Sequence, residues 1–308
     1  MIWLTSNDMT LNQGYSYRHV LGPSASEHST LSFLVANFSH STSSQWQTRL
    51  EAGEIFLDDL KADGLEPLRA GKVLVWNRPG WLEEETPQEY TIIYRDEQLL
   101  VVDKPSGLPT IPGGGFYLNT LLSLVRTDFP DARPLHRLGR ATSGLVLFAF
   151  DTQTASTLIR RWPKVLKQYQ ALSSMVASQD SFDIQSPIGK QDHPRLGNVY
   201  AANAMGKPAR SAARALQRRS NSTVFEVDLH TGRPHQIRIH LAFIGHPLLG
   251  DPLYAAGGQP RMDQPGLPGD GGYWLHAKHL SFEHPVSGLQ LVLKAPLPVI
   301  LQSDPCVK

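Results

Sequence analysis

The sequence has almost no cysteine, and this limits both cross-linking and metal binding. Cys306 is the only cysteine among 308 residues. A single thiol excludes an internal disulfide and a zinc site made of several thiolates. Chains that do without disulfides are typical of reducing compartments, so we expect a cytoplasmic protein.

Long hydrophobic runs are also missing. The clearest apolar run, residues 145–150, is far shorter than the roughly 20 residues of a membrane-spanning helix. Residues 1–19 contain no basic segment followed by an apolar one, which is the pattern of a secretory signal. We therefore expect a protein that is neither secreted nor membrane-bound.

An excess of positive charge is absent as well. The chain has 29 Lys and Arg against 28 Asp and Glu, which gives a net charge of +1. Nucleic-acid-binding domains often have a pI above about 9, whereas the pI here is about 7.9. Any basic surface for a nucleic acid must therefore be local. Hydrophobic residues make up 41% of the chain, an ordinary balance for a globular protein with a sizeable core.

Apolar patterns divide the chain into a small N-terminal region and a larger C-terminal region. Residues 1–30 are polar and have no period, so they predict an extended arm. Residues 31–82 predict two short helices, LSFLVANF and SQWQTRLEAG, followed by two strands, EIFLD and GKVLVW. Residues 83–89 (EEETPQE) are acidic, contain a proline and predict a linker.

Residues 90–308 predict a second domain of strands with a few helices. Helices are predicted over residues 118–126 and 155–162, and the clearest strands carry the letters TIIY, LLVVDK, LVLFAF, KQYQAL, STVFEVDL and GLQLVLK. HQIRIHLAFIG fits either a strand or a helix. Strands and helices do not alternate regularly, which favours an α+β class over a doubly wound fold. The Gly- and Pro-rich residues 256–272 predict a surface loop.

Two segments contain arginines placed near predicted turns. LHRLGRATSGLVLFA carries Arg137 and Arg140 just before a buried strand, and HTGRPHQIRIHLAFIGHPLLGDPLYA carries Arg233 and Arg238. A guanidinium fork suits a phosphate or a carboxylate. Ordinary surface arginines would give the same spacing, so these residues alone leave both interpretations open.

Histidines in the second segment suggest a zinc site, but their spacing is wrong for one. His235 and His240 are five residues apart. On a strand this odd spacing puts them on opposite faces, and a helical zinc pair is usually four apart. We expect no metal here.

Other chemical motifs are incomplete or have a simple structural explanation. Gly113–Gly115 lack the Lys-Ser/Thr of a phosphate-binding loop, and Ser143 is not in a G-x-S-x-G elbow. Lys104 follows an apolar strand and looks structural. By spacing alone, Tyr169 is a half-buried tyrosine of a sheet.

Taken together and in this order, the segments resemble RluA-type RNA pseudouridine synthases over about residues 90–298. The matching segments are VVDKPSGL at 101–108, HRLGRATSG at 136–144, Lys167-x-Tyr169-x-Ala171, TGRPHQIRIH at 231–240, GDPLY at 250–254, LHA at 275–277, FEHP at 282–285 and Ala295-Pro296. Residues 31–76 are similar, more weakly, to an S4-type RNA-binding domain, although Arg49 is the only prominent basic residue of the second predicted helix.

The resemblance implies a fold and an activity. It implies a pseudouridine synthase fold with a mixed, mainly antiparallel central sheet flanked by helices, beside a small α/β S4-like domain. It implies isomerisation of uridine to pseudouridine in structured rRNA or tRNA by a monomer, without a metal or organic cofactor. Tyr169 would pack against the extruded base and Arg238 would pair with the catalytic carboxylate. Arg137, Arg140, Arg233 and His235 would bind RNA.

One residue departs from the family pattern, because the catalytic aspartate is replaced by Gly139. Three explanations are open. Another carboxylate could substitute, with Asp131 closer than Asp151, which lies roughly 20 Å of strand away. The protein could instead bind RNA without modifying it, or belong to a branch of different chemistry. Glycine also permits a positive φ, so the loop could have another shape. A metal-dependent nuclease using the histidines is a further alternative class.

Overall fold

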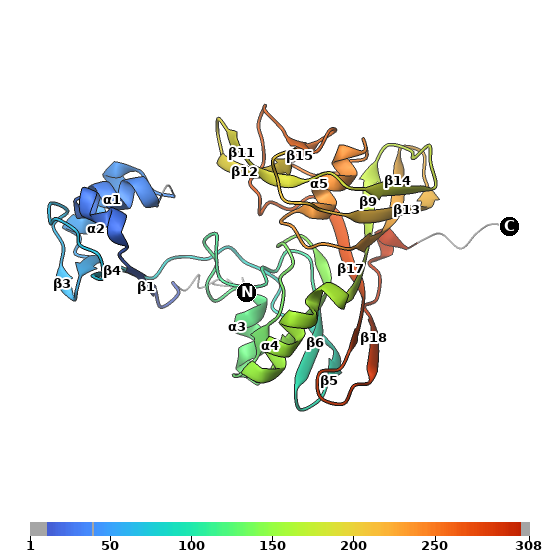
Figure 1. The fold of residues 1–308 in the computed structure, drawn as a ribbon, viewed down its shortest axis with the longest axis horizontal. Helices are drawn as coiled ribbons and strands as arrows, with labels where there is room; N and C mark the ends of the chain where they lie inside the picture. The colour runs from blue at the N-terminus through green and yellow to red at the C-terminus, as the bar shows by residue number, and fades with distance from the viewer. Residues whose placement is uncertain (1–10, 39, 303–308) are drawn as a thin grey trace, which may run out of the picture. The chain divides into compact units, whose positions relative to one another are not determined.

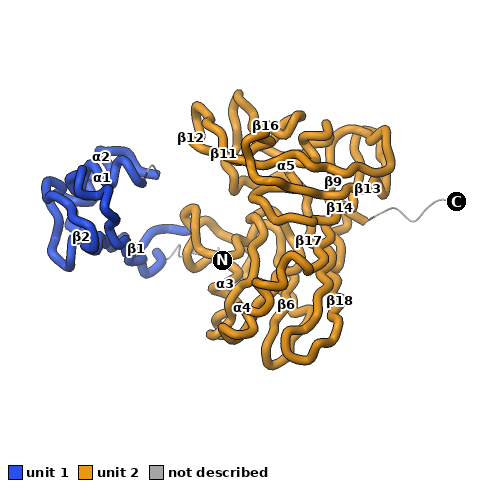
Figure 2. Tube along the Cα trace, in the orientation of Figure 1, with its two compact units in different colours: residues 1–83 blue, residues 84–308 orange. Residues whose placement is uncertain are grey.

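The computed structural model describes residues 11–38 and 40–302, which fall into two compact units. Unit 1 ends at Glu83 and unit 2 begins at Glu84 (Figure 2). The first ten residues of the predicted arm, and Cys306, lie outside the described residues. No helix of the described part is long and apolar enough to cross a lipid bilayer.

Unit 1 is a small antiparallel sheet covered by two helices. Its strands follow the order β1-β4-β2-β3. Their bounds are β1 Tyr15–Val20, β2 Ile55–Leu57, β3 Leu60–Lys61 and β4 Val73–Arg78, and the helices are η1 Pro23–Glu27, α1 Thr30–Asn37 and α2 Ser43–Glu51. The helices α1 and α2 begin at capping boxes, in which Ser29 pairs with Ser32 and Thr42 with Gln45. Trp46 and Leu50, one helical turn apart, are buried in the core of this unit.

The described part of the predicted arm is not an extended tail. Residues 15–20 form β1, which pairs with β4 along six residues. Every residue of β1 is exposed. A strand exposed on both faces shows no alternation of apolar and polar residues, which is why no sequence pattern indicates it.

Unit 2 is built on one large sheet whose strands follow the order β10-β13-β14-β9-β17-β8-β6-β5 (Figure 1). Strands β18 and β7 pair with β17 and β8 beside this path. The strand bounds are β5 Thr91–Arg95, β6 Leu99–Lys104, β7 Arg133–Pro134, β8 Ser143–Ala149, β9 Leu166–Ser174, β10 Ser181–Ile184, β13 Ser211–Arg218, β14 Ser222–Leu229, β17 Trp274–Glu283 and β18 Gln290–Lys294. Only the β17–β8 pair is parallel among these described strands, so the predicted mixed, mainly antiparallel sheet is confirmed.

Helices and short hairpins complete unit 2. Their bounds are α3 Leu121–Asp128, α4 Thr152–Arg161, η2 Trp162–Lys164, α5 Gln236–Phe243, η3 Val299–Leu301, and the hairpin strands β11 Ile188–His193 with β12 Gly197–Ala202 and β15 Tyr254–Ala255 with β16 Gln259–Pro260. The ambiguous segment HQIRIHLAFIG forms helix α5. Residues 236–242 are all buried, so this helix has no polar face to reveal its period.

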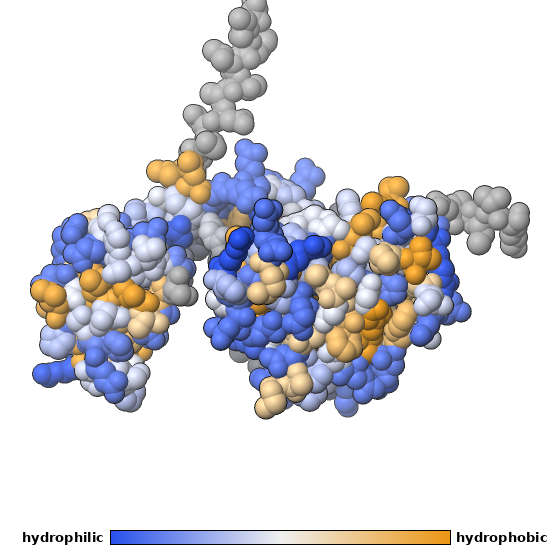
Figure 3. Space-filling view, turned by 90° about the horizontal axis from the view of Figure 1, so that it is seen from above, coloured by the Kyte–Doolittle hydropathy of each residue, from blue (hydrophilic) through white to orange (hydrophobic). Residues whose placement is uncertain are grey.

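Two hydrophobic clusters cover the two faces of the sheet. Leu100 and Val102 of β6 belong to the larger cluster, and Leu99 and Val101 of the same strand belong to the other. Because a cluster covers each face of the sheet, β8 is buried on both faces, and this explains its uninterrupted apolar run. On the outer surface, hydrophobic residues gather on one part of unit 2, and smaller hydrophobic patches also lie on unit 1 (Figure 3).

Lys104, at the end of β6, is fully buried and forms hydrogen bonds to two loops. Its Nζ atom donates hydrogen bonds to the carbonyls of Pro105 (2.9 Å), Leu108 (2.6 Å) and Arg140 (3.1 Å). This contact explains in structural terms why a lysine follows an apolar strand. It also connects the end of β6 to the loop that carries Gly139.

We expect Lys104→Met to lower the free energy of unfolding by about 3 kcal/mol, because a buried polar group that loses its partner costs roughly 1–3 kcal/mol. Lys190→Met, at an exposed lysine, is the matched control. Urea denaturation measures both. Equal stability of the two variants would contradict the structural role of Lys104.

Candidate active site

The loop at residues 135–142 is held from below by side chains of neighbouring elements. The Nε2 atom of His136 accepts a hydrogen bond from the Leu147 amide (3.1 Å), and burial lowers the pKa of His136 to about 4. The Thr110 hydroxyl bonds both the amide and the carbonyl of Leu138. A turn between Gly139 and Thr142 closes the loop. The loop is therefore rigidly presented above the sheet.

Gly139 lies exposed on this loop in an ordinary backbone conformation. Its φ is outside the left-handed region, so the idea that glycine gives the loop a special shape is wrong. A Cβ at this position would lie 3.3 Å from the Tyr273 hydroxyl and 3.6 Å from Oγ1 of Thr142. The end of a tyrosine side chain can shift by tenths of an ångström. The loop can thus accept a side chain at residue 139.

Arg238 of α5 forms a buried, two-pronged ion pair with Asp251. The Nε and Nη2 atoms of Arg238 donate to the two carboxylate oxygens at 2.7 and 2.8 Å, and the side chains are only 3% and 0% exposed. Burial disfavours both charges. The paired hydrogen bonds outweigh burial, raising the pKa of Arg238 and lowering the pKa of Asp251.

The carboxylate of Asp251 is fully occupied. Besides Arg238, it accepts hydrogen bonds from the amides of Leu253 (2.9 Å) and Tyr254 (3.0 Å). A carboxylate with four donors and no exposed surface cannot reach a substrate. Asp251 therefore holds Arg238 and does not replace the carboxylate missing at residue 139. The sequence contained the signal for Asp251 in GDPLY, although no role was assigned to it.

Two tyrosine rings enclose the guanidinium of Arg238. Its Cζ atom lies 4.4 Å from the ring centre of Tyr273 and 5.0 Å from that of Tyr254. Since the Tyr273 hydroxyl also reaches the space beside Gly139, Tyr273 links the loop to α5. Arg238 and Gly139 thus lie on either side of one tyrosine.

His235 stands at the start of α5 in a left-handed conformation, with φ of 54°. Tyr254 donates its hydroxyl proton to the Tyr200 carbonyl (2.8 Å), so the 2.8 Å bond between Tyr254 and His235 is donated by Nδ1 of the histidine. Burial and the charge of Arg238 lower the pKa of His235 to about 4. His235 is therefore neutral at pH 7 and can offer RNA a hydrogen bond but no charge.

Tyr169 lies on β9 beneath the same loop. It is 9% exposed and belongs to the hydrophobic cluster that contains Leu138, Ile237 and Tyr273. Burial raises the pKa of Tyr169 to about 12, and its hydroxyl has no hydrogen-bond partner within the described residues. The ring is thus neutral and offers an apolar surface at the floor of the site.

The remaining predicted site residues lie around this centre. Arg137 is exposed and forms no ion pair or hydrogen bond with any described residue, and its charge contributes to the lowered pKa of His235. Arg140 pairs with Glu84 (2.6 Å) and donates from Nε to the Gly269 carbonyl (3.3 Å). Arg233 donates to the Pro208 carbonyl (3.0 Å). Arg137 is consequently the arginine most available to a phosphate.

The substitution by Asp131 that the sequence left open is wrong, and Asp151, already discounted by its distance along the strand, is excluded as well. Strand β7 pairs Arg133 with Ala149, so both aspartates lie near the last residue of β8. Gly139 precedes the first residue of β8, seven strand residues or roughly 20 Å away. Asp151 is moreover the N-cap of α4, where it accepts the Thr154 amide (2.8 Å).

The predicted surface loop at residues 256–272 contributes directly to the site. The Pro268 carbonyl accepts a hydrogen bond from Nη1 of Arg238 (3.0 Å). The Gly269 carbonyl accepts one from Nε of Arg140 (3.3 Å). The backbone of Gly250 approaches Gly272 so closely that no side chain fits at residue 250. Composition alone predicted a loop here, but it could not predict these contacts.

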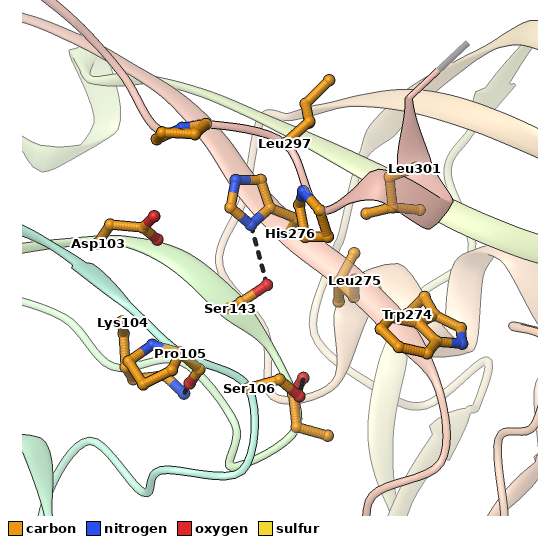
Figure 4. Close-up of a pocket in the computed structure, with 13 residues that line it drawn as sticks. Asp103, Lys104, Pro105, Ser106, Ser143, Trp274, Leu275, His276, Leu297 and Leu301 are labelled. Carbon is orange, nitrogen blue, oxygen red and sulfur yellow. Dashed lines mark hydrogen bonds between the residues drawn. The ribbon is translucent and has the colours of Figure 1, made fainter. Parts of the chain in front are cut away.

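A pocket of about 370 Å³ lies where the ends of β6, β8 and β17 meet the Gly139 loop, whose Ala141 is part of its lining (Figure 4). Asp103 and His276 line it, and both alternate along their strands with residues of the Tyr169 cluster. The ring of His276 bonds the Ser143 hydroxyl at 2.9 Å (Figure 4). Burial raises the pKa of Asp103 to about 6. By strand alternation, Asp103 lies on the face of β6 opposite Val102, which belongs to the cluster of Tyr169.

No described group of three or more His, Cys, Asp or Glu residues has the geometry to hold a metal ion. His240 illustrates the reason, because its Nδ1 and Nε2 atoms are bonded to the Ser211 hydroxyl (3.0 Å) and the Ser186 carbonyl (2.9 Å). This histidine therefore has no nitrogen left for a metal.

Comparison with known proteins gives one consistent result. A family model described as RNA pseudouridylate synthase matches residues 98–243. The chain is 42% identical over 272 residues to an uncharacterized RNA pseudouridine synthase of Synechocystis, covering 87% of this chain and 94% of that protein. It is 35% identical to RNA pseudouridine synthase 5 of Arabidopsis thaliana, covering 95% of each. It is 33% identical to the ribosomal large subunit pseudouridine synthase D of Haemophilus ducreyi, covering 67% of each.

A solved structure supports the fold. Human RNA pseudouridylate synthase domain containing 1 matches with a TM-score of 0.54 and 24% identity, covering 72% of this chain and 89% of that chain. At this identity the match bears on the fold alone. Together with the sequence matches, it confirms the resemblance inferred from the motifs.

We expect Asp251→Asn to lower the free energy of unfolding by about 3–5 kcal/mol, because it leaves a buried guanidinium without its counter-charge. Asp183→Asn is the control, since its ion pair with Arg210 is exposed to solvent and should contribute far less to stability. Urea denaturation measures both changes. A loss of similar size in the two variants would mean that the buried pair contributes no more than a surface pair.

Proposed function

Because the chain belongs to the RluA-type RNA pseudouridine synthase family, we propose that it binds structured RNA and isomerises a uridine to pseudouridine. The observation that carries this proposal is the cluster in which Tyr273 connects the Gly139 loop to the buried pair of Arg238 and Asp251, above the ring of Tyr169. A protein that only bound the RNA backbone would not need a buried arginine beside an apolar tyrosine.

The roles follow from the chemistry. A uridine in a helix must leave the stack before its glycosidic bond can react, at a cost of a few kcal/mol. The ring of Tyr169 receives the extruded base. Arg238, which is already paired with Asp251, positions Tyr273 and the Pro268 carbonyl around it. Isomerisation moves one bond from N1 to C5 of the same base, so it requires neither an oxidant nor a cofactor.

RNA binding is assigned to the residues that surround the site, which are Arg137, Arg140, Arg233 and His235. Arg137 supplies a free guanidinium to a phosphate. Arg140 and Arg233 contribute less, since each already bonds a backbone carbonyl. His235 contributes a neutral hydrogen-bonding nitrogen. The reaction takes place within one nucleotide, so a monomer is sufficient.

Ribosomal RNA is the proposed substrate class, with tRNA as the second candidate. Relatives named as ribosomal large subunit pseudouridine synthases support this choice. A cytoplasmic location is consistent with it, because a chain with one cysteine does not depend on oxidising conditions.

Unit 1 is proposed as an S4-like domain over residues 31–82, joined by the acidic residues 83–89 to a catalytic domain over 90–308. The guanidinium of Arg49, its most prominent basic residue, lies between the rings of Trp46 (4.6 Å) and Trp76 (4.4 Å). An arginine used in this way is less available to phosphate. We therefore assign most RNA contacts to unit 2.

A second function is favoured by one observation. Gly139 has no side chain, and a general acid–base group at a catalytic position is typically worth about 10²–10⁴ in rate. The chain could then be a silent RNA-binding protein on the same scaffold. The two functions differ in one measurable outcome, the formation of pseudouridine.

We expect the purified protein to release tritium from RNA labelled at C5 of uridine, because that hydrogen is lost when C5 bonds to the sugar. Total RNA, ribosomal RNA and tRNA serve as separate substrates. Absence of release from all three, with RNA binding intact, would assign the protein to the silent class.

We expect Arg137→Ala to reduce the slope of log Kd against log salt concentration by about 0.7–0.9, the contribution of one phosphate contact. Arg140→Ala should have a smaller effect, because Glu84 already neutralises this guanidinium. Arg160→Ala, on the exposed face of α4, is the matched control. An unchanged slope for Arg137→Ala would remove it from the RNA interface.

A further inference from the structure

We propose that Asp270 supplies the carboxylate that residue 139 lacks. This inference rests on the proposed synthase activity and names the residue that performs its central step. The site has an arginine, an aromatic floor and an open loop, but no carboxylate at the position where the family pattern has one. The missing group must come from another segment that lies against the same loop.

The segment 267–273 lies against the Gly139 loop at three alternate residues. The Tyr273 hydroxyl reaches the space beside Gly139, the Gly269 carbonyl accepts a hydrogen bond from Arg140 (3.3 Å), and a Cβ on Gly271 would lie 3.8 Å from that of Ala141. The Pro268 carbonyl, in the same segment, bonds Arg238 (3.0 Å). This segment therefore spans both halves of the site.

Asp270 is the one acidic residue of this segment, and it lies between two of these contact points. Its backbone is bracketed by Gly269, whose carbonyl bonds Arg140, and by Gly271, where a Cβ would lie 3.8 Å from that of Ala141. Neighbouring Cα atoms are about 3.8 Å apart, so the Cα of Asp270 stays close to both contacts. The residue is half-buried, close to the turn that follows Asp251.

The carboxylate of Asp270 faces the turn at residues 266–267 and can leave it by rotation. Its Oδ2 atom accepts one hydrogen bond, from the Leu267 amide (2.7 Å), and its carboxylate forms no ion pair with any described residue. The turn itself is closed separately by the Asp270 amide bonding the Leu267 carbonyl (3.0 Å). A rotation about χ1 therefore breaks one hydrogen bond and leaves the turn intact. The flanking glycines place no side chain in the way.

The other carboxylates near the site are paired or lie elsewhere. Glu84, which is directly bonded to the Gly139 loop, pairs with Arg140 (2.6 Å). Asp251 has four donors and no exposed surface. Asp131 and Asp151 lie at the far end of β8, and Asp103 lies on the face of β6 opposite Val102. Asp270 remains as the carboxylate that combines proximity to Arg140 and Ala141 with an unsaturated oxygen.

The step assigned to Asp270 balances without any co-reactant. A carboxylate oxygen bonds C1′ of the uridine as the N1–C1′ bond breaks, and its electron pair stays on the uracil. The base turns so that C5 faces C1′. The C5–C1′ bond then forms as the ester C1′–O bond returns its pair to Asp270. The proton of C5 leaves to solvent, and N1 takes one up.

The experiment compares tritium release and RNA affinity in wild type, Asp270→Asn, Gly139→Asp and the double variant Gly139→Asp/Asp270→Asn. Asparagine keeps an oxygen that can accept the Leu267 amide, so the turn should survive. Asp263→Asn is the matched control, because it makes the same change at an exposed aspartate of the same loop. Binding to the same RNA shows that each variant is folded.

We expect Asp270→Asn to lose about 10²-fold or more in single-turnover rate, the scale of a lost catalytic group, with unchanged RNA affinity. Asp263→Asn should keep full activity, and the double variant should regain activity through the carboxylate introduced at residue 139. Wild-type activity that persists in Asp270→Asn would overturn the role of Asp270 while leaving the synthase activity established. Activity that appears only when Gly139→Asp is introduced would overturn both.

Discussion

A guanidinium and a carboxylate that are both withdrawn from water must satisfy one another, and in this protein Arg238 and Asp251 do so through two hydrogen bonds. The rest of the site is arranged around that requirement. Tyr254 and Tyr273 exclude water from the pair with their rings. The Pro268 carbonyl accepts a hydrogen bond from Nη1, the guanidinium nitrogen that does not bond Asp251. Helix α5 has to be buried along almost its whole surface for the arginine to reach this place.

The same pair explains why the chain can fold with a glycine at residue 139. In a site where the catalytic carboxylate alone neutralised Arg238, its loss would leave a buried charge unpaired. Here Asp251 neutralises Arg238 by itself, so the buried charge stays paired whichever residue stands at position 139. The site is held together by one carboxylate, and in the proposed reaction the chemistry is carried by another. These two requirements fall on different residues of this fold.

Sequence reasoning predicted the parts of the protein that repeat a strong local pattern. The buried strand β8 and the helices α3 and α4 belong to this class, whereas the grouping of Arg238 with the Gly139 loop was implied by the family resemblance alone. It missed β1, whose side chains are all exposed and show no alternation. It left α5 undecided, because a helix buried on nearly all sides has no period. Asp251 was visible in GDPLY, but its partner lies 13 residues away and only the folded chain brings them together.

The turn at residues 267–270 could not be predicted for a different reason. Glycine and proline indicate a loop but carry no information about its partners. The contacts of this loop are made by backbone carbonyls, which every residue has, so no side chain in the sequence marks them. The position of Asp270 beside the site follows from those carbonyls. Its proposed role depends on Gly139, which is far away in the sequence and has no side chain.

The carbonyl oxygen of Arg140 receives two donors from one short stretch of chain, the ammonium of Lys104 and the amide of Gly107 (2.8 Å). One oxygen atom therefore joins the end of a core strand to the residue that follows Gly139. The conformation of this loop is fixed by the Lys104 side chain and the Gly107 amide, which lie outside the proposed substrate contacts. A substitution at residue 139 would therefore add a side chain to this loop, while the hydrogen bonds that fix the loop backbone stay in place.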